Sequence, residues 1–148
     1  MKQFILTLTV MLSVVGMSSF AAGDEKVSPA VLQSFKTNFK NATEVEWKAK
    51  ENFYQAQFAL NGQYISAFYD CEGKMIALTR NISTTQLPIG LQTSLRTEAE
   101  GYWISDLFEV SNEDGTSYYV TLENAETKVV LKSAGTGDWA SYQKQRKA

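Results

Sequence analysis

The residues that could support catalysis are few in this chain of 148 residues, which has no histidine and one cysteine. Without histidine, a Ser-His-Asp triad, a Cys-His dyad, an imidazole base and a histidine zinc ligand are excluded. With Cys71 alone, an intrachain disulfide, a CxxC redox motif and a cysteine metal cluster are excluded as well. Carboxylates are therefore the main groups left that could act as acid, base or ligand.

Three pairs of neighbouring carboxylates occur in the chain, and all lie in strongly polar surroundings. They are Glu44/Glu46, Glu98/Glu100 and Glu113/Asp114. A glycosidase needs two carboxylates flanking a cleft, one of them with a raised pKa, and nothing in the sequence indicates such a cleft. The turn at 111–115 lacks the alternating ligands and terminal glutamate of a calcium loop. We expect no enzyme, no catalytic residue, no metal site and no cofactor; a carboxylate hydrolase is the weakest hypothesis.

The N-terminus has the organisation of a secretory signal peptide. Lys2 supplies a positive start, and residues 4–17 form an apolar run shorter than the roughly 20 residues of a membrane span. Ser19 and Ala21 are the small residues expected before a cleavage site, so we predict a signal peptide over residues 1–21. No cysteine near this site could carry a lipoprotein anchor. A periplasmic or secreted protein without stable membrane insertion after cleavage is expected.

The charges disfavour nucleic acid as a partner. The formal net charge is −2, whereas sequence-independent binding to nucleic acid needs a concentrated basic surface. The end of the chain carries three basic residues, Lys144, Arg146 and Lys147, which are few for membrane or nucleic-acid docking. Cys71 lies in an acidic turn, and either an intermolecular disulfide or an incidental turn position would explain it.

A helix followed by strands is predicted for the first half of the mature chain. Residues 29–40 carry apolar side chains at helical spacing after Ser28, a suitable N-cap. Period-two alternation then begins, and Asn61-Gly62 predicts a type I′ hairpin because both turn positions need positive φ. The register pairs one face of the two strands as Phe58–Ile65, Ala56–Ala67 and Tyr54–Tyr69, and the other face as Ala59–Tyr64, Gln57–Ser66 and Gln55–Phe68.

The same order recurs in the second half. A second amphipathic helix is expected from Ile89, and hairpin residues repeat 64 positions later, as Tyr54 and Tyr118 do. We therefore predict an α+β fold of two tandem repeats, each with an amphipathic helix on an antiparallel sheet. The predicted segments are a domain over 27–137, with repeats over 28–80 and 87–137, and a C-terminal tail over 138–148 that forms a frayed helix.

Asp106 is the residue that fits this pattern least. If Tyr102, Ile104 and Phe108 point into the core, alternation turns Asp106 inward too, which costs several kcal/mol for an unpaired carboxylate. Either the strand contains a bulge here, or Trp103 and Leu107 are the core residues instead. We favour the orientation that places Phe108 in the core.

The sheet face away from the helices is the candidate binding site. An exposed sheet face normally carries polar residues, whereas aromatic residues and methionine suggest recognition of a partner. Burial of this face by the tail, by the other repeat or in a homodimer is the alternative. The predicted partner-binding residues are Phe53, Tyr64, Phe68, Met75, Trp103 and Tyr119.

Several spaced residues give the chain a family resemblance. Phe35, Phe39, Asn41-Ala42, Val45 and Trp47 are followed by Tyr54, Phe58, Asn61-Gly62, Tyr69-Asp70, Gly73-Lys74 and Leu87-Pro88. This pattern resembles the PepSY-like, or β-lactamase-inhibitor-like, secreted bacterial proteins, over roughly residues 27–137. The resemblance implies tandem helix-and-sheet repeats like those of the β-lactamase inhibitory protein (BLIP), a periplasmic or secreted location and no catalysis. Lys40 and Gly101 replace a proline common in the family after each helix.

Two functional hypotheses follow from these observations. The first is a non-enzymatic binding protein, a protein-interaction or enzyme-inhibitor-like module, that holds an unidentified protein on the open sheet face. The alternative is a cell-envelope sensor that binds a small ligand between the two repeats. Because a fold does not fix a function, the resemblance does not transfer inhibitory activity to this chain.

Overall fold

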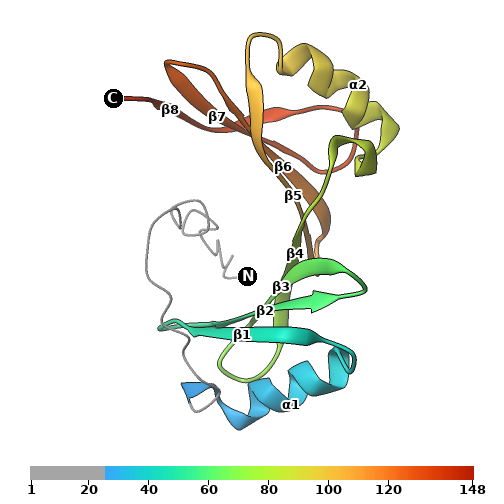
Figure 1. Ribbon diagram of the computed structural model, residues 1–148, viewed down its shortest axis with the longest axis vertical. Helices are drawn as coiled ribbons and strands as arrows, with labels where there is room; N and C mark the ends of the chain where they lie inside the picture. Colours follow the sequence, from blue (N-terminus) through green and yellow to red (C-terminus); the bar gives the residue numbers. More distant parts are fainter. Residues whose placement is uncertain (1–25) are drawn as a thin grey trace.

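The computed structural model describes residues 26–148, so the predicted signal peptide over residues 1–21 lies outside the described part. Each half of the described chain consists of one α-helix followed by four strands (Figure 1). The first half contains α1 (Pro29–Asn38), β1 (Thr43–Ala49), β2 (Tyr54–Leu60), β3 (Gln63–Tyr69) and β4 (Met75–Asn81). The second contains α2 (Ile89–Glu98), β5 (Trp103–Asn112), β6 (Gly115–Glu123), β7 (Thr127–Ser133) and β8 (Ala140–Arg146), after a short 3₁₀-helix, η3 (Thr84–Gln86).

The eight strands form one antiparallel sheet in sequence order, from β1 to β8. Because each strand pairs with its neighbour in the chain, every connection between paired strands is local except the one through η3 and α2. The structure confirms the predicted α+β class and its two helix-plus-sheet repeats.

Local sequence signals explain where the elements begin and how they pair. The Val31 N–H donates to the Ser28 side chain at 3.4 Å, which confirms Ser28 as the N-cap of α1. Asn61 and Gly62 have φ of +50° and +79°, and the β2–β3 register is the predicted one throughout. The predicted β6–β7 register is also confirmed, including the pair of Glu123 with Lys128.

Each helix covers its own hydrophobic core. Under α1 the buried residues include Val31, Phe35, Trp47, Ala56, Phe58, Ala67 and Tyr69. Under α2 they include Leu87, Leu91, Leu95, Leu107, Val120, Leu122 and Leu131. Burial of these apolar side chains is the main stabilising contribution, and it is divided between two separate cores.

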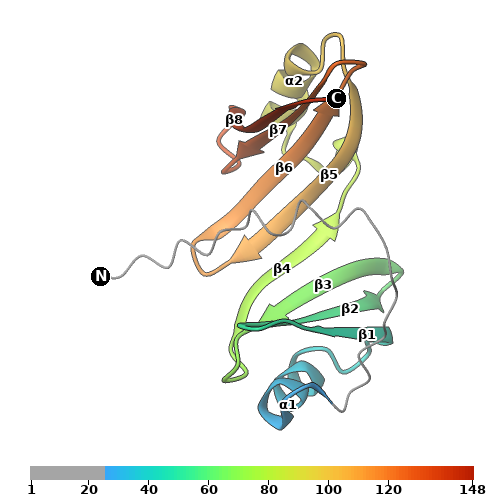
Figure 2. The same cartoon turned by 90° about the vertical axis from the view of Figure 1, so that its left-hand side faces the viewer.

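The two halves meet where β4 pairs with β5, over Leu78–Asn81 and Phe108–Ser111. The Arg80 guanidinium donates to both carboxylate oxygens of Glu109, at 3.0 and 3.4 Å, and links the two strands on the helix side. The sheet bends at this junction, so the faces without helices turn toward each other (Figures 1 and 2). We call this face, turned away from both helices, the concave face.

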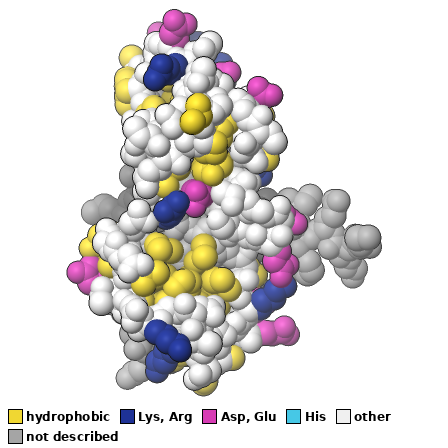
Figure 3. Space-filling view, turned by 90° about the vertical axis from the view of Figure 1, so that its right-hand side faces the viewer, with side chains coloured by type: hydrophobic (Ala, Val, Ile, Leu, Met, Phe, Trp, Pro, Cys, Tyr) yellow, Lys and Arg dark blue, Asp and Glu magenta, His cyan; other side chains and the backbone are white. Residues whose placement is uncertain are grey.

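The outer side of the bend carries apolar side chains as well. They gather in the half that contains α1, beside a pair of opposite charges (Figure 3). Partly buried residues around the first core include Phe39, Leu60, Ile65 and Leu78. These side chains extend the core under α1 rather than forming a separate surface.

The expected frayed helix at the C-terminus is wrong. The segment forms β8, an edge strand paired with β7, so it completes the second repeat beyond residue 137. Every residue of β8 is exposed, and the strand therefore has no apolar alternation that could predict it. Trp139, just before β8, anchors this segment, because its indole N–H donates to the Leu91 carbonyl at 3.3 Å.

The favoured orientation of the 102–110 strand is also wrong, and the bulge explains why. The β5–β6 register shifts between Ile104 and Asp106, which leaves Ser105 as an extra residue. After the bulge, Leu107 points into the core under α2, while Phe108 and Val110 lie on the concave face. Asp106 is half-buried and accepts a hydrogen bond from the Asn81 amide at 2.8 Å.

A second bulge moves Met75 to the side opposite to the expected one. The β3–β4 register shifts between Phe68 and Tyr69, so Tyr69 pairs with Met75. Met75 therefore packs against the core under α1, not on the concave face.

Candidate functional site

The predicted site residues fall into three groups in the structure. Tyr64 and Trp103 are 62% and 53% exposed and lie on the concave face. Phe68 and Tyr119 are on the same side of the sheet but are buried, and Phe53, half-buried, packs on Phe68 with ring centroids 6.1 Å apart. Met75 lies on the other side of the sheet. Of the six predicted binding residues, Tyr64 and Trp103 are therefore the exposed aromatic ones.

Tyr64 is held in place by β1. Its hydroxyl donates to the Glu44 carboxylate at 2.6 Å, although both residues are exposed. Glu44 sits where the β1–β2 register is irregular and has a φ of +53°, an uncommon backbone conformation for glutamate. The irregularity places the carboxylate within reach of Tyr64, so the exposed ring is oriented by a hydrogen bond.

This hydrogen bond predicts a measurable titration shift. The hydrogen bond to Glu44, and then the negative charge of Glu44, raise the pKa of Tyr64 above its ordinary value, and Glu46 adds a smaller effect. We expect Glu44→Gln to lower the pKa of Tyr64 toward the ordinary tyrosine value, as measured by NMR of its Cζ carbon. Glu46→Gln, the matched control, should change it less. An equal effect of both variants would contradict the hydrogen-bonded arrangement.

A cluster of aromatic residues covers the concave face in the second half. The rings of Phe108 and Tyr119 stack with centroids 5.1 Å apart, and Tyr142 from β8 packs edge-on against Tyr119 at 5.4 Å. Lys132 lies over the Tyr119 ring, with its Nζ 5.4 Å from the centroid. Tyr119 is thus buried by its neighbours, while Tyr142 remains 37% exposed.

Trp103 lies beside this cluster and is covered on one side by the C-terminus. The Lys147 Nζ is 4.8 Å from the centre of the Trp103 ring and 3.1 Å from a Glu123 carboxylate oxygen. The nearby Ser105 hydroxyl and the Lys147 ammonium lower the pKa of the Glu123 carboxyl. Lys147 also donates to the Asn124 carbonyl at 2.8 Å, so the last residues of the chain are fastened next to Trp103.

The concave face carries charges of both signs at each end. At the β1 end, Glu46 pairs with Gln57 and Lys48 pairs with Gln55, on the face opposite the core residue Trp47. At the other end, Lys132 pairs with Tyr119 and Lys128 pairs with Glu123.

The carboxylate pairs considered in the sequence lie on the surface. All six residues are exposed, and Glu113 bridges to Lys74 at 2.7 Å. In residues 26–148 no group of three or more acidic, cysteine or histidine side chains is placed to hold a metal ion. Cys71 is exposed in the β3–β4 turn. Within the same residues, neither helix is long and apolar enough to span a membrane.

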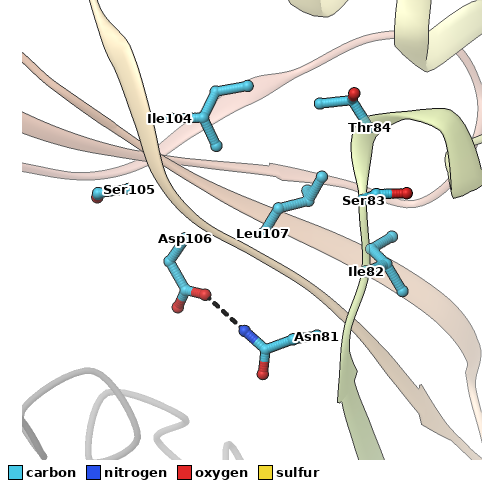
Figure 4. A pocket seen from close by; sticks show the side chains of 8 residues that line it. All are labelled: Asn81, Ile82, Ser83, Thr84, Ile104, Ser105, Asp106 and Leu107. Carbon is cyan, nitrogen blue, oxygen red and sulfur yellow. Dashed lines mark hydrogen bonds between the residues drawn. The ribbon is translucent and has the colours of Figure 1, made fainter. Parts of the chain in front are cut away.

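A groove opens where β4 and β5 separate. Its cavity volume is about 330 Å³, at the small end of the range for ligand sites. One wall is the segment Asn81–Thr84, and the other is Ile104–Leu107 of β5 (Figure 4). This groove lies at the junction of the two repeats, where the sequence analysis placed the alternative small-ligand site.

Two residues of the concave face were missed in the sequence. From the sequence, Phe108 is expected in the core because regular alternation is favoured over a bulge at Ser105. The inward position that alternation gives Asp106 indicates the bulge. Tyr142 was missed because the tail was expected to be helical. The burial of Phe68 and Tyr119 by cross-strand neighbours could not be read from alternation, which assigns a face but not its coverage.

The sheet and helix arrangement defines a class of α+β protein with a BLIP-like fold. A solved BLIP-like protein from Bacteroides fragilis is 22% identical with a TM-score of 0.69, and the match covers 81% of this chain and 86% of that one. A DUF2874 family protein from Bacteroides uniformis is 18% identical with a TM-score of 0.72, over 81% and 89% of the two chains. A candidate periplasmic protein from Bacteroides eggerthii is 12% identical with a TM-score of 0.72, over 81% and 88%.

No family model and no curated protein matches the sequence. At these identities the structural neighbours show the fold alone. None of these three neighbours is described as an enzyme. The BLIP-like fold is therefore established, while membership of the PepSY-like family remains a prediction.

Proposed function

We propose that this chain is a non-enzymatic binding protein of the periplasm, or a secreted one, that holds a protein partner on its concave face. The main observation is the exposure of Tyr64 and Trp103, 62% and 53%, one on each half of that face. Exposed aromatic residues on a bent sheet can enter pockets of a partner, and such residues dominate binding energies.

Two observations support a location outside the cytoplasm. The N-terminal sequence has the pattern of a signal peptide. One structural neighbour is described as a candidate periplasmic protein.

The proposal is tested with two single variants of the aromatic residues. A partner is first isolated from a cell-envelope extract of the native host with the mature chain as bait, identified and purified. Trp103→Ala and Tyr64→Ala are then each expected to weaken its binding by about 30-fold in calorimetry, the equivalent of about 2 kcal/mol. Truncation removes a large ring from the centre of the contact, so the loss should be mainly in the dissociation rate.

Ile89→Ala is the matched control for these variants. Ile89 is 82% exposed, but it lies on α2, away from the concave face. The control should bind the partner as the unchanged chain does. Unchanged affinity of both Trp103→Ala and Tyr64→Ala would overturn the proposal. If the purified chain sediments as a dimer that forms through this face, the partner is a second copy of the chain.

The small-ligand alternative has one observation in its favour, the groove between Asn81–Thr84 and Ile104–Leu107. Asp106 is its single charged residue, and one wall is the edge of a strand. These features favour an extended peptide as the ligand over a small molecule.

A further inference from the structure

The upper part of β5 is an open edge inside an otherwise continuous sheet. β5 pairs with β6 over its full length, Trp103–Asn112, but with β4 only over Phe108–Ser111. The chain leaves the sheet after Asn81 and turns into η3 and α2. Residues 103–106 of β5 therefore have no strand beside them on the β4 side, over a length of roughly 13 Å at 3.3 Å per residue.

The pairing of the β4 segment with β5 ends at Ile82 and Leu107, which form one hydrogen bond of the expected two. The Ile82 N–H donates to the Leu107 carbonyl at 3.0 Å. In an antiparallel ladder the two residues of such a pair also form the reciprocal bond. The bond from the Leu107 N–H to the Ile82 carbonyl is not among the backbone hydrogen bonds outside the strand ladders of residues 26–148, and the N–H of an antiparallel residue points to the same side as its carbonyl. A backbone donor at the floor of the groove is thus available to an incoming strand.

The opposite wall of the groove is fixed and leaves room beside this edge. The Ser83 N–H donates to the Gln86 side chain at 2.8 Å, and the Gln92 amide donates to the Leu87 carbonyl at 2.8 Å. These bonds fix the conformation of η3 and the start of α2. Figure 4 shows Thr84 and Ile104 on opposite sides of the opening, with Leu107 between them.

The side chains of the groove are divided as the two faces of a strand would be. Ile82, Ile104 and Leu107 supply apolar surface on the α2 side, and Ile104 is 38% exposed at the rim. On the concave side Asp106 supplies a carboxylate, held by the Asn81 amide. Successive side chains of a bound strand would point alternately to the apolar side and to the carboxylate.

We propose that this groove binds an extended peptide segment, which adds to the sheet along the edge of β5 at residues 103–106. The peptide takes the place that β4 vacates, antiparallel to β5, and accepts a hydrogen bond from the Leu107 N–H. Its sequence carries a β-branched or aromatic residue toward Ile104 and a lysine or arginine, one or three positions away, toward Asp106. The site uses the backbone edge of β5 and the groove side chains, and it excludes Tyr64, although Trp103 lies at the end of the same edge.

The experiment is a selection of seven-residue peptides displayed on phage against the purified mature chain. An enriched sequence is then made as a free peptide, and its affinity is measured together with the hydrogen exchange of backbone amides. We expect enrichment of the apolar and basic pattern, and at least tenfold slower exchange of the Leu107 N–H when the peptide is bound. Asp106→Asn should weaken binding several-fold by removing the charge.

Thr84→Trp is the blocking variant, because a large side chain at this exposed position fills the groove without changing β5. It should weaken peptide binding at least tenfold. Thr85→Trp is the matched control, since Thr85 is exposed and adjacent but does not line the groove, and it should bind as the unchanged chain does.

The proposal is overturned if selection yields no enriched sequence, or if enriched peptides bind Thr84→Trp and the unchanged chain equally. Binding of a small molecule in the groove with no peptide enrichment would also overturn it and support the sensor alternative. Thr84→Trp should leave the affinity of a concave-face partner unchanged, whereas Tyr64→Ala should reduce that affinity and leave peptide binding unchanged. The two proposals can therefore fail independently.

Discussion

Replacing Phe58 with alanine is expected to lower the free energy of unfolding by about 3–5 kcal/mol. Phe58 is fully buried in the core under α1. Its ring lies 5.0 Å from that of Phe35 in α1 and 4.7 Å from that of Phe39, the C-cap of α1, so truncation removes contacts to both aromatic residues. Because Phe58 is in the middle of β2, the surrounding sheet cannot collapse to fill the cavity.

The measurement is urea unfolding followed by tryptophan fluorescence. Trp47 is 4% exposed and packs edge-on against Phe35, so it reports directly on this core. Phe53→Ala is the control, since Phe53 precedes the same strand, is half-buried and lies outside the core cluster. Its cost should be roughly 1 kcal/mol, the typical effect of a single substitution. A smaller loss for Phe58→Ala than for Phe53→Ala would show that α1 does not pack on β2 as described.

The parts of the fold that the sequence predicted correctly are those determined by neighbouring residues. Asn61-Gly62 fixes a two-residue turn, and the turn then sets the register of every pair from Leu60–Gln63 to Tyr54–Tyr69. The N-cap of α1 is equally local, since Ser28 contacts Val31 three positions later. In both cases the required conformation involves residues a few positions apart, so no tertiary information is needed.

The errors occur where the pairing of neighbouring strands departs from a regular register, or where a strand has no apolar alternation. Both bulges insert one residue, and every side chain beyond the insertion changes face, which moved Met75 and Phe108. β8 was missed because an edge strand can be stabilised by backbone pairing alone, without an apolar face. Half of the candidate site was therefore predictable: Tyr64 lies inside the correctly predicted hairpin, whereas Tyr142 and the groove at β5 depend on the β7–β8 and β4–β5 pairings.

Gly73→Ala should be the second strongly destabilising change, by about 2–4 kcal/mol, because backbone strain and overpacking add at this position. Gly73 has a φ of +92°, and an added Cβ would lie 2.9 Å from the Ala30 carbonyl oxygen and 3.0 Å from its carbon. These are backbone atoms of the first turn of α1, which cannot move aside cheaply. The β3–β4 turn is also tied down, since Asp70 accepts from the N–H groups of Glu72 and Lys74 at 2.9 Å each.

Two other glycines distinguish the cost of backbone strain from the cost of the close contact with α1. Gly62 and Gly137 have φ of +79° and +99°, and an added Cβ at either would meet nothing within 4 Å. Gly62→Ala and Gly137→Ala should therefore cost only the strain, about 1–2 kcal/mol in urea unfolding. Gly137 matches Gly73 in the second repeat, 64 positions later, so the comparison isolates the contact between a turn and its helix. If Gly73→Ala costs no more than Gly137→Ala, the β3–β4 turn does not touch α1, and the two repeats pack their helices alike.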